Sequence, residues 1–147
     1  MARAPHVISS LGLGSCVAVT LYDRLRRVGG VVHIMLPDSN GLSGPFSPYR
    51  CADTAIAALI REMQGRGAAP QDMVAKMVGG ARMFDACDDS GTAIGEENVT
   101  SVKRLLIRGR IPLMGEDTGR DYGRNIEFHL SSGKLIVSAI GKENKVI

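Results

Sequence analysis

Two apolar, β-branched segments near the N-terminus constrain the fold of this chain most strongly. Residues 17–22 alternate and predict a strand, and residues 27–36 predict a second strand that ends at Pro37. Only the polar interruption 23–26 separates them, so we expect an antiparallel hairpin. The sequence therefore predicts a fold built on a pair of adjacent strands.

Apolar residues at helical spacing indicate two helices further along the chain. One is predicted over residues 54–63, with Asp53 as its N-cap and a stop at the glycines that follow. The other is predicted over residues 96–108, with Gly109 as its stop. Residues 7–15 are expected to form a turn-rich entry to the first strand. The remaining strands are expected over 73–78, 111–114, 125–130 and 134–140, and the loops over 37–50, 85–93 and 115–123.

The order of these elements, ββ-α-β-α-β-ββ, predicts the fold class. It lacks the strict βαβ alternation of a doubly wound sheet, so mixed or antiparallel sheets are favoured. We expect an α+β fold, a layered α/β sandwich with mixed, largely antiparallel sheets and two main helices packed outside. No repeat or linker interrupts the pattern, which predicts one domain over residues 1–147.

Composition and charge argue against several classes of protein. The chain has 147 residues, 44% hydrophobic and 22% charged, as in ordinary globular domains. A net charge of +3, three Tyr, three Phe and no Trp argue against nucleic acid as a partner. No apolar run reaches the roughly 18 residues of a membrane span, and no signal-peptide pattern opens the chain. With three cysteines and no CxxC pair, we expect a cytoplasmic protein with reduced thiols and no membrane insertion.

The predicted hairpin brings one cysteine and one histidine together. If its loop is centred between Arg24 and Leu25, residues whose numbers sum to 49 face each other, as Cys16 and His33 do. Such partners lie on the same face of the sheet, with Cβ atoms about 4.5–5.5 Å apart. A register slip of one residue would destroy the contact. The hairpin therefore predicts a contact between thiol and imidazole.

A Cys–His pair is the minimum unit for catalysis by a thiol nucleophile. The thiolate attacks, while an adjacent imidazolium lowers the thiol pKa and later protonates the leaving group. Gly12 and Gly14 lie before Cys16, and a turn there would let substrate approach and could present N–H groups to an oxyanion. The alternative is structural: Cys16 as a small buried hydrophobe and His33 as a core residue.

The other cysteines and histidines favour structural roles. Cys51 precedes the first predicted helix and Cys87 lies in a loop, and neither has a histidine nearby in the sequence. A metal site formed by Cys16, His33 and a remote cysteine remains possible, but no ligand spacing supports it. His129 alternates within a predicted strand, which is typical of a structural or exposed residue.

Two further motifs have a functional and a structural interpretation. Gly79-Gly80 follows a predicted strand, but no phosphate-loop pattern surrounds it, so we expect tight backbone packing beside a helix or sheet. Asp85, Asp88 and Asp89 could bind a divalent cation, but they lack the spacing of an EF-hand and predict a solvated loop.

The motif Leu-Gly-Leu-Gly-Ser-Cys-Val over residues 11–17 resembles the chemoreceptor glutamine deamidase family, CheD. A histidine follows the cysteine of this motif 17 positions later, which makes the resemblance specific. Further matching segments run in the family's order and cover nearly the whole chain. They are residues 33–37, Ala52-Asp53, residues 76–84, Ile94-Gly95 with Asn98, and Gly123-Arg124 with Phe128.

This resemblance implies an enzyme that hydrolyses side-chain amides of particular glutamines on methyl-accepting chemotaxis receptors, giving glutamate and ammonia. It implies Cys16 as the nucleophile and His33 as the general acid–base. Ser10 stands where the family has a Thr or Ser hydroxyl that orients the imidazole, and the serine lacks the methyl that would restrict χ1. The implied fold is a layered α/β fold, and no cofactor is implied.

The resemblance also implies partners. The substrate would be the cytoplasmic helices of chemotaxis receptors, and the CheC phosphatase would be a second partner. A function of a different class stays open, that of a non-catalytic chemotaxis adaptor that binds receptor or CheC. The segment before Ser10 is shorter than the family usually has, and Thr118-Gly119-Arg120 stands where a Gly-Gly pair is usual.

Overall fold

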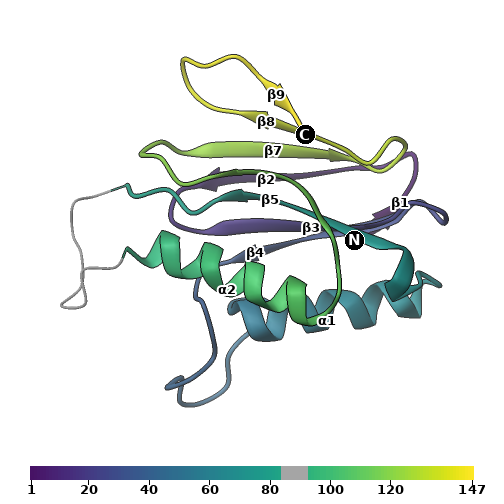
Figure 1. Cartoon of the computed structure of the whole chain (residues 1–147), viewed down its shortest axis with the longest axis horizontal. Coiled ribbons are helices and arrows are strands. Elements are labelled where there is room, and N and C mark those ends of the chain that lie inside the picture. Colours follow the sequence, from purple (N-terminus) through teal and green to yellow (C-terminus); the bar gives the residue numbers. More distant parts are fainter. Residues whose placement is uncertain (84–92) are drawn as a thin grey trace.

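The chain folds into two β-sheets and two main helices (Figure 1). The structure is a computed structural model that describes residues 1–83 and 93–147. The elements in chain order are β1 (Ala2–Arg3), β2 (Val7–Leu13), β3 (Val17–Asp23), β4 (Val28–Ile34), α1 (Ala52–Gly65), the 3-10 turn η1 (Pro70–Asp72), β5 (Met73–Gly79), α2 (Ile94–Arg108), β6 (Leu113–Thr118), β7 (Arg124–His129), β8 (Lys134–Ser138) and β9 (Lys145–Val146).

The five-stranded sheet has the strand order β1-β4-β3-β5-β6. Its centre is the predicted hairpin, in which β3 and β4 pair antiparallel over their whole length. β5 lies antiparallel to β3 on the other side, while β5 and β6 run parallel. The connection between these parallel strands contains α2, as a parallel pair requires a crossover. The sheet is therefore mixed but largely antiparallel, as the sequence predicted.

The four-stranded sheet has the order β2-β7-β8-β9, and every pair in it is antiparallel. Three strands of the two sheets differ from the sequence analysis. Residues 7–13 form a strand rather than a turn-rich entry, because β2 finds a complete partner in β7, and the turn is confined to 14–16. The strand β6 continues to Thr118 because it pairs with β5, so the predicted loop begins later. The short β9 was not predicted.

Both predicted helices are present, and their starts differ slightly from the prediction. The N-cap of α1 is Cys51 rather than Asp53, because extended backbone continues to Cys51 through a bridge with Leu36. Asp53 lies instead in the first turn, where its Oδ2 accepts hydrogen bonds from the N–H and the hydroxyl of Ser39. α1 ends at Gly65 and α2 is capped by Gly109, as the glycine signals predicted.

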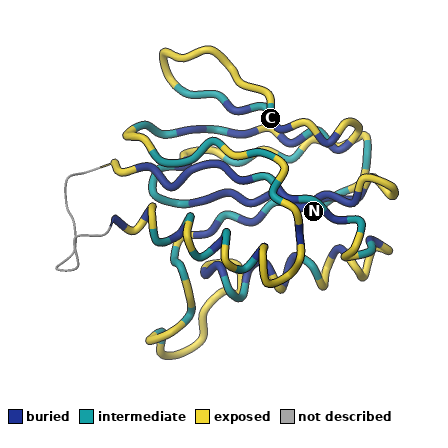
Figure 2. Tube along the Cα trace, in the orientation of Figure 1, coloured by how far each residue is buried: buried dark blue, intermediate teal, exposed yellow. Residues whose placement is uncertain are grey.

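The molecule has three layers, with two hydrophobic cores between them. The first core lies between the helices and the five-stranded sheet and includes Val17, Val19 and Leu21 of β3. The second core lies between the two sheets and includes Ala18 and Tyr22 of the same strand. Figure 1 shows both helices on one side of the strands, and Figure 2 shows that the central strands are buried while the outer helix faces are exposed.

The predicted fold class, an α+β sandwich with mixed sheets and two outer helices, is confirmed. The strand β3 is buried on both faces because a core lies on each side of it. Most of the predicted 85–93 loop lies outside the described residues, and so do Cys87 and the three neighbouring aspartates. In the described part of the chain, the helices are too short and too polar to cross a membrane.

Candidate active site

Cys16 occupies a tight turn that leads from β2 into β3. The carbonyl of Cys16 accepts a hydrogen bond of 2.9 Å from the N–H of Gly80, and the carbonyl of Gly14 accepts one of 2.8 Å from Ala81. Gly79 has a φ of +120°, and a Cβ at this position would lie 2.1 Å from the Cys16 carbonyl oxygen. Only glycine therefore allows this approach of backbone to backbone, as the sequence predicted for the Gly79-Gly80 pair.

A cavity of about 290 Å³ opens beside the thiol. One wall is the turn that carries Cys16, and the opposite wall is the first turn of α2 with the segment after β5. Met83 and Ile94 give the rim an apolar character, since both are about 40% exposed. The described lining residues are Gly12, Gly14, Ser15, Cys16, Ala81, Arg82, Met83, Ala93, Ile94 and Gly95.

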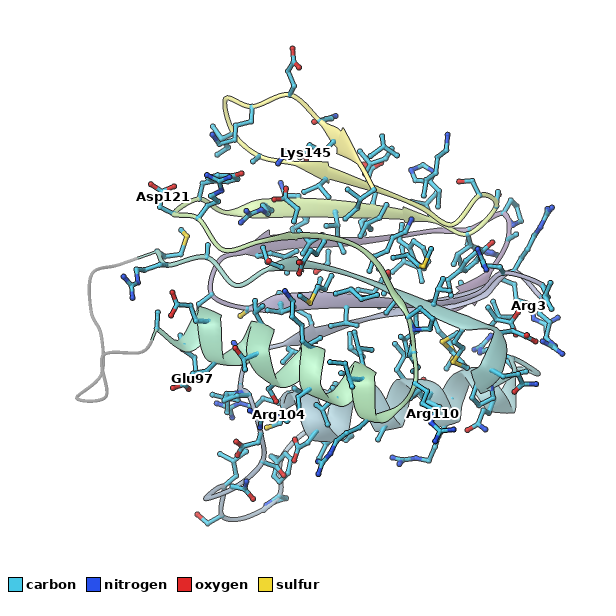
Figure 3. The ribbon with its side chains drawn as sticks, viewed as in Figure 1. Arg3, Glu97, Arg104, Arg110, Asp121 and Lys145 are labelled. Atoms are coloured by element: carbon cyan, nitrogen blue, oxygen red, sulfur yellow. The ribbon has the colours of Figure 1, made fainter. Side chains whose placement is uncertain are left out.

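A charged hollow adjoins this cavity. Gly80, Arg82 and Glu96 line it together with Gly119, Arg120 and Asp121 of the connection between β6 and β7. This connection is tied to the cavity wall because the Arg120 carbonyl accepts a hydrogen bond of 2.7 Å from the N–H of Arg82. Figure 3 labels Asp121 and Glu97, and both lie toward the end of the molecule at which α2 begins. Charged side chains therefore border the entrance to the thiol.

His33 and Ser10 meet across the two sheets. Ser10 lies on β2 of the four-stranded sheet, and His33 lies on β4 of the five-stranded sheet. The Ser10 hydroxyl oxygen is 3.2 Å from Nδ1 of the imidazole. Both side chains are half-buried, and neither is among the described residues that line the thiol cavity. The contact predicted from the family resemblance is therefore present.

The predicted direct pairing of Cys16 with His33 is wrong by two residues. Ala18 faces His33 in the observed register, whose partners sum to 51 rather than 49. The reason is the turn, which is displaced toward Arg27, a residue with a φ of +52°. A shift of two preserves the alternation of faces within the two strands. Cys16 itself lies in the turn at 14–16, just before β3 begins at Val17, and is not paired with a residue of β4.

Burial favours the neutral form of both groups. It raises the pKa of the Cys16 thiol above its ordinary value of 9.0, although a hydrogen bond with its own backbone N–H acts in the opposite direction. Burial also lowers the pKa of His33 below 6.5. The sequence analysis expected an imidazolium that lowers the thiol pKa. Neither shift has the charge of the other group among its causes, so the lowering of the thiol pKa by an imidazolium stays a prediction.

Sequence reasoning gave no role to Asn98, although the residue appeared in the family resemblance. Asn98 lies on α2 and is fully buried. Its side-chain amide nitrogen lies 3.1 Å from the carbonyl oxygens of Ser15 and Met35, and donates to both. A signal was available, because Asn98 and Val102 are four residues apart on the apolar face of the helix, where an amide is unusual.

The other candidate residues are not brought to this site. Cys51 is fully buried at the start of α1, and burial raises its thiol pKa. His6 Nδ1 contacts the carbonyl of Arg3, and His129 lies 3.6 Å from Glu127 on β7. Within residues 1–83 and 93–147, no group of three or more His, Cys, Asp or Glu side chains is placed to hold a metal ion.

Comparison with known proteins gives a consistent result. The family described as "CheD chemotactic sensory transduction" matches residues 35–139. The match thus begins after all three candidate residues, Ser10, Cys16 and His33.

Individual relatives cover nearly the whole chain. A protein of Caldanaerobacter subterraneus subsp. tengcongensis named "Probable chemoreceptor glutamine deamidase CheD" is 44% identical over 146 residues, which are 99% of this chain and 90% of that protein. A protein of the same name from Moorella thermoacetica is 46% identical over 147 residues, with 99% and 88% covered. One from Thermococcus kodakarensis is 43% identical over 135 residues, with 92% and 84% covered.

Proposed function

The chain belongs to the CheD family and is a chemoreceptor glutamine deamidase, and we propose that Cys16 is its nucleophile, with His33 as general acid–base. The observation that carries this proposal is the contact of 3.2 Å between Ser10 Oγ and His33 Nδ1. It orients the imidazole at the end of the hairpin where the neighbouring residues Val17 and Ile34 pair, and the thiol at that end lines a cavity. A nucleophile, a base and a residue that orients the base are the minimum set for this type of hydrolysis.

The orientation of the imidazole determines which nitrogen can act as the base. We assign the hydrogen bond so that Nδ1–H donates to the Ser10 hydroxyl oxygen, because Nε2 then keeps its lone pair. The lowered pKa of His33 keeps the imidazole neutral at pH 7, which a base requires. Nε2 can therefore take the thiol proton as the sulfur attacks, so the mechanism needs no preformed thiolate.

The first half of the reaction forms a thioester. The sulfur of Cys16 bonds to the amide carbon of the substrate glutamine while its proton passes to His33 Nε2. The C–N bond then breaks, the imidazolium returns the proton to the leaving nitrogen, and ammonia departs. The backbone N–H of Cys16, which acts to lower the pKa of its own thiol, supports the negative charge that develops on the carbonyl oxygen.

The second half of the reaction releases glutamate. Water gives a proton to His33 Nε2 and adds to the thioester carbon, and the C–S bond breaks as the imidazolium returns the proton to sulfur. The enzyme regains its starting state, and no metal, electron or cofactor enters the balance. The family resemblance supports the cytoplasmic helices of chemoreceptors as the substrate, and a reaction on these helices would take place in the cytoplasm.

Ammonia release from a receptor fragment that contains glutamine tests this function. Cys16→Ala should reduce turnover to the background rate, while the control Cys51→Ala should retain it because Cys51 is fully buried and is not among the described residues that line the cavity. Mass spectrometry of the fragment should show glutamine replaced by glutamate in the control alone. Turnover that survives in Cys16→Ala would rule out the proposed nucleophile.

Binding to the CheC phosphatase is a second proposal, supported by the family resemblance alone. It corresponds to an adaptor role that does not require the thiol. Co-elution of the chain with CheC in size-exclusion chromatography tests it, with Cys16→Ala as the second sample. Co-elution of both samples supports an adaptor role beside catalysis, and separate elution of the wild-type chain excludes it.

A further inference from the structure

A buried amide connects the two catalytic segments. Asn98 Nδ2 carries two hydrogens, and the structure directs both of them at backbone carbonyls, those of Ser15 and Met35 at 3.1 Å each. Ser15 immediately precedes Cys16, and Met35 lies two residues after His33. One side chain on α2 therefore holds both the turn with the thiol and the end of the strand with the imidazole.

The hydrogen bond to Ser15 has a consequence for the next residue. The carbonyl of Ser15 and the N–H of Cys16 belong to one planar, trans peptide unit, in which the two groups point in opposite directions. Asn98 draws the carbonyl toward the interior, so the N–H of Cys16 must point away from α2. The backbone N–H of Cys16 also acts to lower the pKa of its own thiol, which agrees with this direction.

The other end of the amide shows that packing alone does not explain this residue. Oδ1 of Asn98 is fully buried, and none of the described residues donates a hydrogen bond to it. A buried acceptor without a partner costs about 1–3 kcal/mol. An apolar side chain at this position would have no acceptor to satisfy and would avoid this cost. The two donated hydrogen bonds therefore have to account for the presence of an amide.

We propose that Asn98 is a positioning residue that fixes the Ser15–Cys16 peptide, so that the Cys16 N–H faces the reacting sulfur and the developing oxyanion. This inference rests on the proposed role of Cys16 as the nucleophile. Removal of the amide allows the peptide to rotate, and the N–H then no longer supports the charge in the transition state. The defect should affect the chemical step and leave substrate binding intact.

Two measurements on Asn98→Ala test the proposal. The first is the rate of alkylation by iodoacetamide as a function of pH, read at Cys16 by peptide mass mapping. The second is kcat and KM for glutamine in a receptor fragment. We expect the midpoint of alkylation to move to higher pH, kcat to fall about 10²-fold, and KM to stay unchanged, as for the loss of one oxyanion donor.

Ser101→Ala is the matched control. Ser101 lies on the same helix, and its hydroxyl donates to the carbonyl of Pro37. It thus joins α2 to the segment after β4 without touching the Cys16 turn. We expect Ser101→Ala to leave both measurements unchanged. Asn98→Asp, which keeps the shape but places a carboxylate against two carbonyls, should reproduce the loss at neutral pH.

The outcomes separate positioning from simple stability. If Asn98→Ala lowers the melting temperature but leaves the alkylation profile and kcat unchanged, the proposal is wrong. An equal loss in Ser101→Ala also overturns it, because the effect would then belong to the docking of α2. If Asn98→Ala does not fold, Asn98→Ser replaces it, with the same expected results. Alkylation needs no receptor, so this test remains valid even if receptor turnover fails.

Discussion

The two ends of the β3–β4 hairpin differ in how completely their buried polar groups are paired. At the turn, Asp23 is fully buried and its carboxylate accepts hydrogen bonds from the N–H groups of Leu25, Arg26 and Ala69 and from the Arg26 guanidinium. These partners hold the pKa of Asp23 below its ordinary value of 3.8 despite the burial of the carboxyl. The charge at this end is therefore paired, and the turn is stable.

The other end of the same two strands pairs its groups less completely. Cys16 and His33 are half-buried there, with no charged partner among residues 1–83 and 93–147, and burial shifts both pKa values toward the neutral forms. A cavity of about 290 Å³ adjoins the thiol, and the Oδ1 of Asn98 has no donor among the described residues. The groups that stabilise the hairpin therefore lie at its turn, and the groups proposed to react lie at its open end.

Replacing His33 should produce the largest loss of activity with a small loss of stability. We expect His33→Ala to lower kcat about 10²–10⁴-fold, the usual contribution of general acid–base catalysis. His129→Ala is the matched control, because His129 is also a half-buried strand histidine but lies away from the cavity. Ammonia release and thermal melting should be measured together. A large fall in the melting temperature without a specific loss of kcat would indicate a core histidine instead.

Replacing Asp23 should produce the opposite pattern. We expect Asp23→Ala to lower the free energy of unfolding by about 3 kcal/mol, because the backbone donors lose their charged acceptor. Asp72→Ala is the control, since Asp72 also pairs with Arg26 but at the surface, and it should cost less than about 1 kcal/mol. Urea unfolding followed by circular dichroism measures both. An equal loss of unfolding free energy in the two variants would contradict the stabilising role of the buried Asp23 carboxylate.

A pH titration should separate the two ends. His33 must be unprotonated to act as base, and burial lowers its pKa below 6.5. Activity should therefore be full above pH 6.5 and fall, by up to about tenfold per pH unit, as pH drops through the lowered value.

Stability should respond mainly at lower pH. The folded-state pKa of Asp23 is below 3.8, so the stabilisation from this carboxylate is complete above that value and is lost only as pH falls through the folded pKa. The lowered pKa of His33 adds a smaller loss below pH 6.5, since the unfolded chain then binds the proton more readily. Activity should be measured as kcat/KM and stability by urea unfolding across pH 3–8. If activity and stability fall over the same pH range, the loss of activity is caused by unfolding.

The sequence contained enough information for the hairpin but not for its register. Alternation in residues 17–22 and 27–36 predicts two strands, but the position of the turn depends on which residue adopts a positive φ. Arg27 does so, and no glycine or asparagine marks it. The resulting error was two residues rather than one, so the alternation of faces within the two strands was kept although the pairing of Cys16 with His33 was wrong.

Local sequence patterns could not predict the contacts between segments that are distant in the chain. The strand β2 reads as a turn-rich segment on its own, and it becomes a strand by pairing with β7, more than a hundred residues later. The roles of Asp23 and Asn98 also depend on partners in other elements, such as Ala69 and Ser15. Only the family resemblance pointed to Ser10, and its contact with His33 crosses between two sheets.

The smallest expected effect concerns the hydroxyl that joins the two sheets at the reactive end. Ser10→Ala removes the acceptor for His33 Nδ1–H, so the imidazole loses one constraint on its rotation and tautomer. We expect kcat to fall by about 3–10-fold, the value of one modest hydrogen bond of about 1 kcal/mol. The change should not alter unfolding measurably, because Ser10 is half-buried.

Ser10→Thr tests whether orientation is the property that matters. It keeps the hydroxyl and adds a methyl that restricts χ1, so kcat should equal or slightly exceed that of the wild-type chain. If Ser10→Ala retains full kcat, the contact is a structural link between the sheets and His33 is held by its strand alone. If Ser10→Thr loses activity while Ser10→Ala retains it, crowding of the added methyl is the reason. The pair of variants thus separates orientation of the base from packing at the same site.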